Sequence, residues 1–203
     1  MASDDHKPVA WVETIPQAEA TGAVREAYRA VAGPDGTVEN LYLAMSLTPD
    51  VIKPADDQYL ALLHTPDSPL QPWLAELVST HVAILCGSEY AWLNHGENFE
   101  AHFGDRAASG AMLEALHAGT WREKIADPMA RAALGFGDKL TLRPAEMAET
   151  DIVALREAGF TDKAISYLAQ LASSFAYWSR IINALGIRLG DTIGVNGVPA
   201  PKR

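Results

Sequence analysis

The sequence predicts an all-α protein, and two features of its pattern support this class. Apolar residues recur at steps of three and four in nearly every patterned segment, which is the spacing of one helix face rather than the alternation of a strand. Ala and Leu dominate these segments, where Val, Ile and Thr would be typical of strands. At 203 residues, with 48% hydrophobic and 21% charged, the chain can bury a core. We therefore expect a single all-helical domain over residues 1–203.

The N-terminal third predicts a lead-in followed by three helices. Residues 1–20 contain prolines and lack a sustained period, so we expect them to be extended. The three helices are expected over 23–33, 40–47 and 50–64, and each is followed by a Gly-Pro or Thr-Pro pair. Pro54 lies inside the third helix, where we expect a kink or a restart.

The middle of the chain predicts a helical hairpin. Pro72 suits the first turn of a buried helix over 72–86. Gly87 is suited to ending this helix and Ser88 to capping the next one, which we expect over 89–103. The two helices would then pack against each other across a very short connection.

The C-terminal half predicts four further helices. We expect them over 109–119, 127–142, 152–159 and 163–186. The last one is amphipathic to fully apolar and long enough to be the packing centre of the fold. Residues 191–203, which include NGVPAPKR, are expected to form a loose tail.

Composition excludes several classes of function. The chain has 26 acidic and 16 basic residues, and its formal charge of −10 would repel nucleic acid. No apolar stretch approaches the ~20 residues that a membrane span requires, and the N-terminus has no signal pattern. Cys86 is the single cysteine, so no intrachain disulfide can form, which suits a reducing compartment. We expect a cytoplasmic protein without nucleic-acid or membrane partners.

One face of the 89–103 helix carries the residues most suited to chemistry. Steps of three and four residues bring them to the same side: Ser88, Ala91, Trp92, His95, Phe99 and His102. On the preceding helix, Glu76 lies twelve residues before Ser88, so the hairpin can bring its carboxylate beside this face. A carboxylate, a hydroxyl and an imidazole could therefore converge.

The spacing of these residues resembles the signature of the alkylhydroperoxidase D-like and carboxymuconolactone decarboxylase-like superfamily. Its redox members carry a Glu, a Cys-x-x-Cys motif that begins twelve residues later, and a His four residues after the second Cys. Glu76, Ser88, Ala91 and His95 occupy these positions here. The flanking segments are similar to the peroxidase-related subgroup, so the resemblance covers most of 20–190. It implies an alkylhydroperoxidase D-like helical bundle built around the hairpin, and a homo-oligomer (dimer, trimer or hexamer).

The residues at the two cysteine positions determine what chemistry remains. Ser88 and Ala91 cannot cycle between thiol and disulfide, so the dithiol peroxidase reaction should be absent. Glu76, Tyr90 and His95 remain, and a carboxylate bonded to an imidazole fixes its tautomer for general acid–base catalysis. The decarboxylase-like branch includes members without the redox pair, and this resemblance implies a lyase or isomerase.

We expect its substrate to be a small organic molecule, carboxylated or lactone-like, in an apolar pocket. Trp92 and Phe99 are the expected pocket residues, with core positions as the alternative. No cofactor is expected. No metal is expected either, because His95 and His102 are about 10 Å apart along their helix, too far to share one ion.

Three alternatives to acid–base catalysis stay open. The protein could be a peroxidase-related oxidoreductase that uses Cys86 alone, although that residue lies at a helix C-terminus, where the partial negative charge disfavours a thiolate. It could also be a non-catalytic small-molecule-binding protein, or a scaffold protein of the same fold. Without the family resemblance, a histidine placed like His95 is a hydrogen-bonded core residue as often as it is a functional one. A serine placed like Ser88 is more commonly an N-cap than a nucleophile.

Overall fold

The computed structural model describes residues 8–194 and 196–201, and this part of the chain is almost entirely helical. The α-helices in chain order are α1 (Gly22–Val31), α2 (Asn40–Leu43), α3 (Pro49–Leu63), α4 (Pro72–Leu85), α5 (Glu89–Phe103), α6 (Arg106–His117), α7 (Trp121–Lys124), α8 (Pro128–Leu142), α9 (Glu149–Glu157) and α10 (Asp162–Leu185). Two 3₁₀ turns, η1 (Gln17–Glu19) and η2 (Pro144–Glu146), and two short strands, β1 (Thr192–Ile193) and β2 (Val198–Pro199), complete the described elements. The all-α prediction is confirmed.

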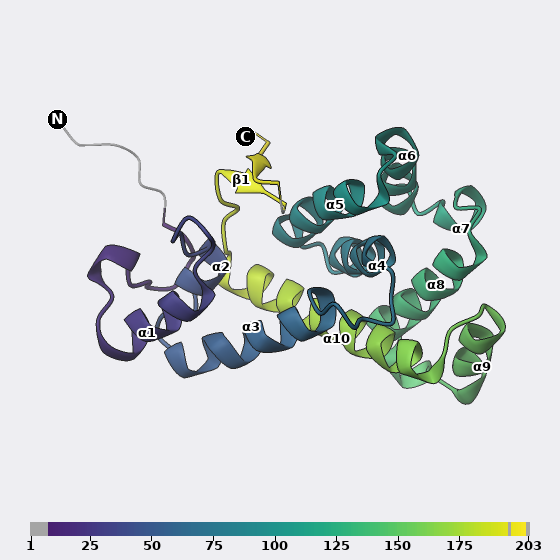
Figure 1. Cartoon of the computed structure of the whole chain (residues 1–203), viewed down its shortest axis with the longest axis horizontal. Helices are drawn as coiled ribbons and strands as arrows, with labels where there is room; N and C mark the ends of the chain where they lie inside the picture. Colours follow the sequence, from purple (N-terminus) through teal and green to yellow (C-terminus); the bar gives the residue numbers. More distant parts are fainter. Residues whose placement is uncertain (1–7, 195, 202–203) are drawn as a thin grey trace.

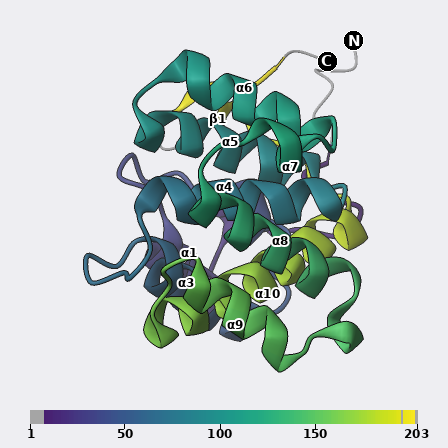
Figure 2. The ribbon, with the colours of Figure 1, turned by 90° about the vertical axis from the view of Figure 1, so that its right-hand side faces the viewer.

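The hairpin of α4 and α5 occupies the centre of the fold. The long helix α10 packs along α4 and also contacts α3 and α8 (Figure 1). Viewed from the side, α5 and α6 lie on one side of α4, while α10 and α9 lie on the other (Figure 2). This enclosure explains why every residue of α4 from Leu74 to Ala83 is buried. A polar group on this helix therefore needs a partner inside the protein.

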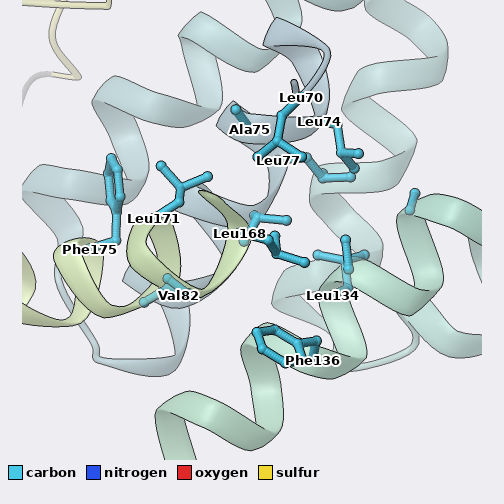
Figure 3. Packing of buried hydrophobic residues seen from close by; sticks show 14 of the residues in the cluster. Leu70, Leu74, Ala75, Leu77, Val82, Leu134, Phe136, Leu168, Leu171 and Phe175 are labelled. Carbon is cyan, nitrogen blue, oxygen red and sulfur yellow. The ribbon is translucent and has the colours of Figure 1, made fainter. Parts of the chain in front are cut away.

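The main core forms where α4, α8 and α10 meet. Leu77 of α4, Leu134 of α8 and Leu168 of α10 are fully buried and face one another in Figure 3. Replacing a leucine at such a position by alanine typically costs about 2–5 kcal/mol, because the cavity that it leaves closes only in part. The core therefore fixes α4 relative to α10.

Backbone hydrogen bonds define the junction between α4 and α5. Gly87 has a φ of 66°, and its N–H donates to the carbonyl of Ile84 at 2.9 Å. The N–H of Ser88 donates to the carbonyl of Ala83, also at 2.9 Å. This pair of bonds is the Schellman helix ending, in which glycine adopts the left-handed conformation without steric cost. Gly87 is confirmed as the helix stop, and α5 begins at Glu89 as expected.

Ser88 precedes α5 as predicted, but its side chain does not cap the helix. The side chain accepts no hydrogen bond from the first turn, and the residue is 0% exposed. Its hydroxyl oxygen has no hydrogen-bond partner among the described residues. The capping interpretation is wrong because the hydroxyl is buried in the interior instead of lying over the helix N-terminus.

Other boundaries differ by a few residues. The helix expected over 40–47 ends at Leu43 and continues only as turns. The helix expected over 109–119 begins at Arg106, because the Asp105 carboxylate accepts hydrogen bonds from the N–H groups of Ala107 and Ala108. Pro54 lies inside α3, which continues from Pro49 to Leu63, so the helix does not restart there. The short helix α7 has no counterpart in the sequence prediction.

The first described residues pack beside the end of α10 and the segment that follows it. The N–H of Trp11 donates to the carbonyl of Leu185 at 2.8 Å, and the N–H of Arg188 donates to the carbonyl of Val9 at 2.9 Å. Part of the extended lead-in thus runs beside the residues that follow α10, while residues 1–7 of the expected lead-in lie outside the described part. At the C-terminus, where we expected a loose tail, β1 and β2 pair antiparallel and β1 contacts α5 (Figure 1).

Candidate functional site

The central interaction of the candidate site joins the two helices of the hairpin. Nδ1 of His95 on α5 lies 2.7 Å from Oε2 of Glu76 on α4. Glu76 is 2% exposed and His95 is 9% exposed, so both groups are largely removed from water. Asn98, one turn after His95, donates from Nδ2 to the other carboxylate oxygen at 3.3 Å. The convergence of Glu76 and His95 that the sequence spacing predicted is present.

This geometry assigns the tautomer of His95. A carboxylate only accepts hydrogen bonds, so Nδ1 carries the proton and donates it to Glu76. In the neutral form of the ring Nε2 is the unprotonated nitrogen, and none of the described residues forms a hydrogen bond to it. The site therefore contains an oriented imidazole whose basic nitrogen remains available.

Two aromatic rings hold the imidazole in place. The ring of Phe175 on α10 meets that of His95 edge to face, with centroids 4.5 Å apart. Tyr59 on α3 lies at 6.1 Å, also edge to face, and its hydroxyl is 3.1 Å from Nε2 of His64. Burial, reinforced by the charge of Glu76, raises the pKa of Tyr59 well above its ordinary value. Tyr59 therefore remains a neutral phenol at any physiological pH.

His95 lines a cavity of about 300 Å³, which is at the small end of the range for ligand sites. Its walls come from the end of α1, from α2, α3, α5 and α10, and from the C-terminal hairpin. Asn94 and Asn98 add amide groups beside the imidazole, while Phe175 and Ile182 supply apolar surface. An enclosed imidazole, amides and apolar walls together form a site suited to a small organic molecule.

Tyr90 lines the same cavity, and its hydroxyl donates to Oε2 of Glu39 at 3.1 Å. Burial and the neighbouring Glu39 carboxylate raise the pKa of Tyr90 well above its ordinary value. The phenol is therefore a hydrogen-bond donor in the wall of the cavity and cannot act as a base at neutral pH.

The two residues expected to form the pocket lie elsewhere. Trp92 packs against His117, with ring centroids 4.6 Å apart, and Phe99 is fully buried beside Phe103. Neither residue lines the cavity of His95. A helix turns about 100° per residue. Trp92 and Phe99 therefore lie on one side of His95 around α5.

The cavity lies on the opposite side of His95. Ala91, Asn94 and Asn98 all project there and line the cavity. The face predicted from the sequence is centred on His95. In the structure, His95 lies at the edge of the side of α5 that faces the cavity.

The two positions that correspond to the redox cysteines have different surroundings. Ala91 lines the cavity, whereas Ser88 does not and is fully buried. Cys86, the alternative thiol, also lies outside the cavity lining. Burial raises the pKa of Cys86, and the charge of Arg180 offsets this only in part. The uncharged thiol is therefore favoured, which disagrees with a peroxidatic cysteine.

The C-terminal hairpin closes one side of the cavity. Gly194 lines the cavity, and its N–H donates to Oδ1 of Asn94 at 3.0 Å. It has a φ of 69°, and a Cβ atom there would lie 2.8 Å from Cγ of Glu97 and 2.9 Å from its Cβ. Glycine therefore permits both the backbone conformation and the close approach to α5.

A second buried histidine lies outside this cavity. Nε2 of His81 on α4 is 3.5 Å from Oδ1 of Asp138 on α8, and neither ring nitrogen has a hydrogen-bond partner in the described part of the chain. The ring packs edge to face on Trp121. Burial lowers the pKa of His81 to about 4, although the Asp138 carboxylate acts in the opposite direction. His81 is therefore neutral at pH 7.

The described residues contain neither a metal-binding cluster nor a membrane-spanning helix. Over residues 8–194 and 196–201, no group of three or more His, Cys, Asp or Glu side chains is placed to hold a metal ion. In the same ranges, none of the helices combines the length and the apolar character needed to cross a bilayer.

Several residues of the site were not identified from the sequence. Asn98 follows His95 by three residues, and this spacing on one helix was a usable signal. Tyr59 and Phe175 come from helices far away in the chain, so no local pattern connects them with His95. Asn94 and Gly194 likewise meet only because the C-terminal hairpin folds back onto α5.

Comparison with known proteins gives the fold. No protein-family model and no curated protein matches the sequence. Among solved structures, an uncharacterized peroxidase-related protein from Ralstonia eutropha JMP134, described as an alkylhydroperoxidase AhpD core, is 23% identical with a TM-score of 0.77 and covers 91% of this chain and 94% of its own. An uncharacterized peroxidase-related protein from Silicibacter sp. TM1040 is 22% identical, with a TM-score of 0.76 and coverage of 93% and 95%.

A more distant structure is that of the debrominase Bmp8. It is 14% identical, has a TM-score of 0.66, and covers 91% of this chain and 93% of its own. At these identities the similarity concerns the arrangement of helices and not the chemistry. The chain therefore has the alkylhydroperoxidase D-like helical fold that its motif spacing predicts, with serine and alanine at the two cysteine positions of that motif.

Proposed function

We propose that the protein is an acid–base enzyme of the lyase or isomerase type, in which His95 transfers a proton to or from a small organic substrate. One observation carries this proposal. The buried Glu76 carboxylate holds Nδ1 of His95 at 2.7 Å, while His95 also lines a cavity large enough for a small molecule. A purely structural histidine would not need a cavity beside it.

The carboxylate performs two functions in this proposal. It keeps the proton of the neutral ring on Nδ1, so that Nε2 can accept a proton from the substrate. Once Nε2 is protonated, the ring is an imidazolium, and the negative charge of Glu76 at hydrogen-bond distance stabilises it. Asn98 holds the other oxygen of Glu76 and so maintains the geometry. Positioned proton transfer of this kind contributes a rate factor of about 10²–10⁴.

Tyr90 has a secondary role in this mechanism. Its phenol stays protonated and donates to Glu39 at 3.1 Å in the cavity wall, so it can supply a hydrogen bond to a substrate oxygen or keep Glu39 oriented. It is not the base. The proton acceptor of the site is His95.

Two further observations favour acid–base chemistry over the alternatives. A dithiol reaction has no cysteine at positions 88 and 91, and the buried Cys86 thiol favours its uncharged form. A structure of the debrominase Bmp8 is a complex with 2,3,4-tribromopyrrole, so a protein with this fold binds a small organic ring. This supports a small organic ligand here and leaves the reaction to be tested.

The proposal is tested by proton exchange with solvent. Wild-type protein is incubated in D₂O with a panel of small amines, esters, lactones and carbonyl compounds, and deuterium uptake at carbon is measured by mass spectrometry. His95→Gln should lower the uptake rate by about 100-fold or more. His117→Gln is the matched control, because that imidazole packs on Trp92 outside the cavity.

Unchanged exchange in His95→Gln would refute the assignment of the base. Binding of panel members without any exchange would instead support the non-catalytic alternative, a small-molecule-binding protein with this fold.

A further inference from the structure

The charges around the cavity are strongly asymmetric. Among its described lining residues, Glu39 and Asp56 carry carboxylates, and His64 and His95 are the titratable bases. No Lys or Arg is among these residues. Glu76 adds a third carboxylate directly behind His95. A ligand that enters the cavity therefore meets negative charge and no fixed positive charge.

Asp56 differs from Glu76 because it is buried with no described basic side chain at hydrogen-bond distance. It is 7% exposed, and Tyr42 donates a hydrogen bond to its Oδ1. No described Lys, Arg or His lies within ion-pair distance of either oxygen, and Oδ2 has no hydrogen-bond partner among the described residues. A buried carboxylate without a positive partner is costly, and a cationic ligand would remove this cost.

The cavity walls suit a cation in a second way. Five aromatic side chains line it, namely Tyr42, Tyr59, Tyr90, Phe175 and Trp178. The faces of aromatic rings attract positive charge, most strongly where water is excluded. Carboxylates together with aromatic rings are the combination that recognises organic ammonium groups.

The electrostatics at Tyr59 show that the carboxylates act on one region. The charges of Glu76, Glu39 and Asp56 all raise the pKa of the Tyr59 phenol, in addition to the larger effect of burial. Tyr59 lies next to His95 in the cavity wall. The negative potential is therefore concentrated beside the proposed base.

We propose that the substrate is a small protonated organic amine with an apolar or aromatic body, whose ammonium group pairs with Asp56 and lies near Glu39. The inference rests on the proposed function in one respect, namely that the His95 cavity is the substrate site. It replaces the carboxylated substrate expected from the sequence, because a carboxylate would face Glu39 and Asp56 without a compensating cation.

The test uses three probes that share a phenyl ring and differ in charge at pH 7: benzylamine is a cation, benzyl alcohol is neutral and benzoate is an anion. Calorimetric titration of the wild type at pH 7 should show benzylamine binding about tenfold or more tightly than benzyl alcohol, and no measurable binding of benzoate. Asp56→Asn should weaken benzylamine binding by about tenfold or more and leave benzyl alcohol nearly unchanged. Asparagine retains an oxygen that accepts from Tyr42, which preserves the local hydrogen bond.

Asp57→Asn is the matched control, since Asp57 is the next residue on α3 but is exposed and paired with Lys53. It should leave the binding of all three probes unchanged. Glu39→Gln is a second test variant, because Glu39 also lines the cavity and is exposed. It should weaken benzylamine binding by a smaller factor than Asp56→Asn.

Three results would overturn the proposal: benzoate binding as tightly as benzylamine, unchanged benzylamine affinity in Asp56→Asn, or no benzylamine binding by the wild type. The acid–base function fails separately. His95→Gln should still bind benzylamine, so binding without His95-dependent exchange would refute the catalysis and leave the ligand class intact.

Discussion

The hydrogen bond between Glu76 and His95 should contribute to stability far more than an exposed ion pair of the same length. Glu76 is enclosed by the protein, and its two oxygens bond to His95 and Asn98. A hydrogen bond to a charged group contributes about 1.5–3 kcal/mol, and removing one partner of a buried pair costs about 3–5 kcal/mol. Each of Glu76→Ala and His95→Ala should therefore destabilise by about 3–5 kcal/mol.

The two effects should not add. Once one partner is absent, removing the other eliminates an unsatisfied group, so the double variant should be about 2–3 kcal/mol more stable than the sum of the single effects predicts. Urea unfolding followed by circular dichroism measures all four proteins. In a domain of this size, 1 kcal/mol corresponds to about 2–4 °C in Tm, so thermal unfolding provides a second readout.

The pair Lys53 and Asp57 is the control for this cycle. Its atoms are 2.6 Å apart, slightly closer than those of Glu76 and His95, but both side chains are 56% exposed. Its coupling energy should be about 0.3–0.5 kcal/mol. Additivity within about 0.5 kcal/mol for the buried pair would show that the bond is weak, and would refute the view that Glu76 fixes the orientation of His95.

Three further perturbations test other parts of the structure. The unfolded His81 imidazole has a pKa near 6.5 and the folded one near 4, so the unfolded state binds more protons between these values. Stability should therefore fall by up to about 3 kcal/mol as the pH drops from 6.5 to 4, and the urea midpoint of His81→Leu should fall less over this range. Gly194→Ala should displace the C-terminal hairpin and weaken ligand binding in the cavity, whereas Gly197→Ala, with a φ of 58° but open space around it, should cost stability alone. Ser88→Ala should leave the free energy of unfolding unchanged or raise it by up to about 1 kcal/mol, and a loss of about 2 kcal/mol would reveal a hydrogen bond that the structure lacks.

The sequence predicted helix limits accurately where residues that end helices, such as glycine, stand on both sides of the helix. Helix α5 has its expected limits because Gly87 ends the preceding helix and Gly104 follows α5 with a φ of 82°. The four-residue helix α7 was missed because Trp121 anchors it by tertiary burial, and so short a segment has no periodicity. The C-terminal hairpin was missed for a similar reason, since its strands have two residues each.

The candidate site was predictable only where its parts lie on one hairpin. The spacing of Glu76 and His95 identified the hydrogen-bonded pair, because α4 and α5 are adjacent in the chain. The side of α5 that faces the cavity was not predictable, since it depends on where α3 and α10 pack. Asp56 was not identified for the same reason, because a single acidic residue on an amphipathic helix usually faces water.

The protonation of the two ring nitrogens of His95 is the most direct test of its role as an oriented base. Protein with ¹⁵N-labelled histidine, together with His95→Gln for assignment, allows NMR to report the protonation of each ring nitrogen. Nδ1 should carry a proton that it donates to Glu76, and benzylamine should shift the Nε2 resonance while that of the remote His117 stays in place. A ring protonated at Nε2 instead of Nδ1, or an Nε2 resonance that does not respond to a ligand bound in the cavity, would contradict the role of His95 as an oriented base.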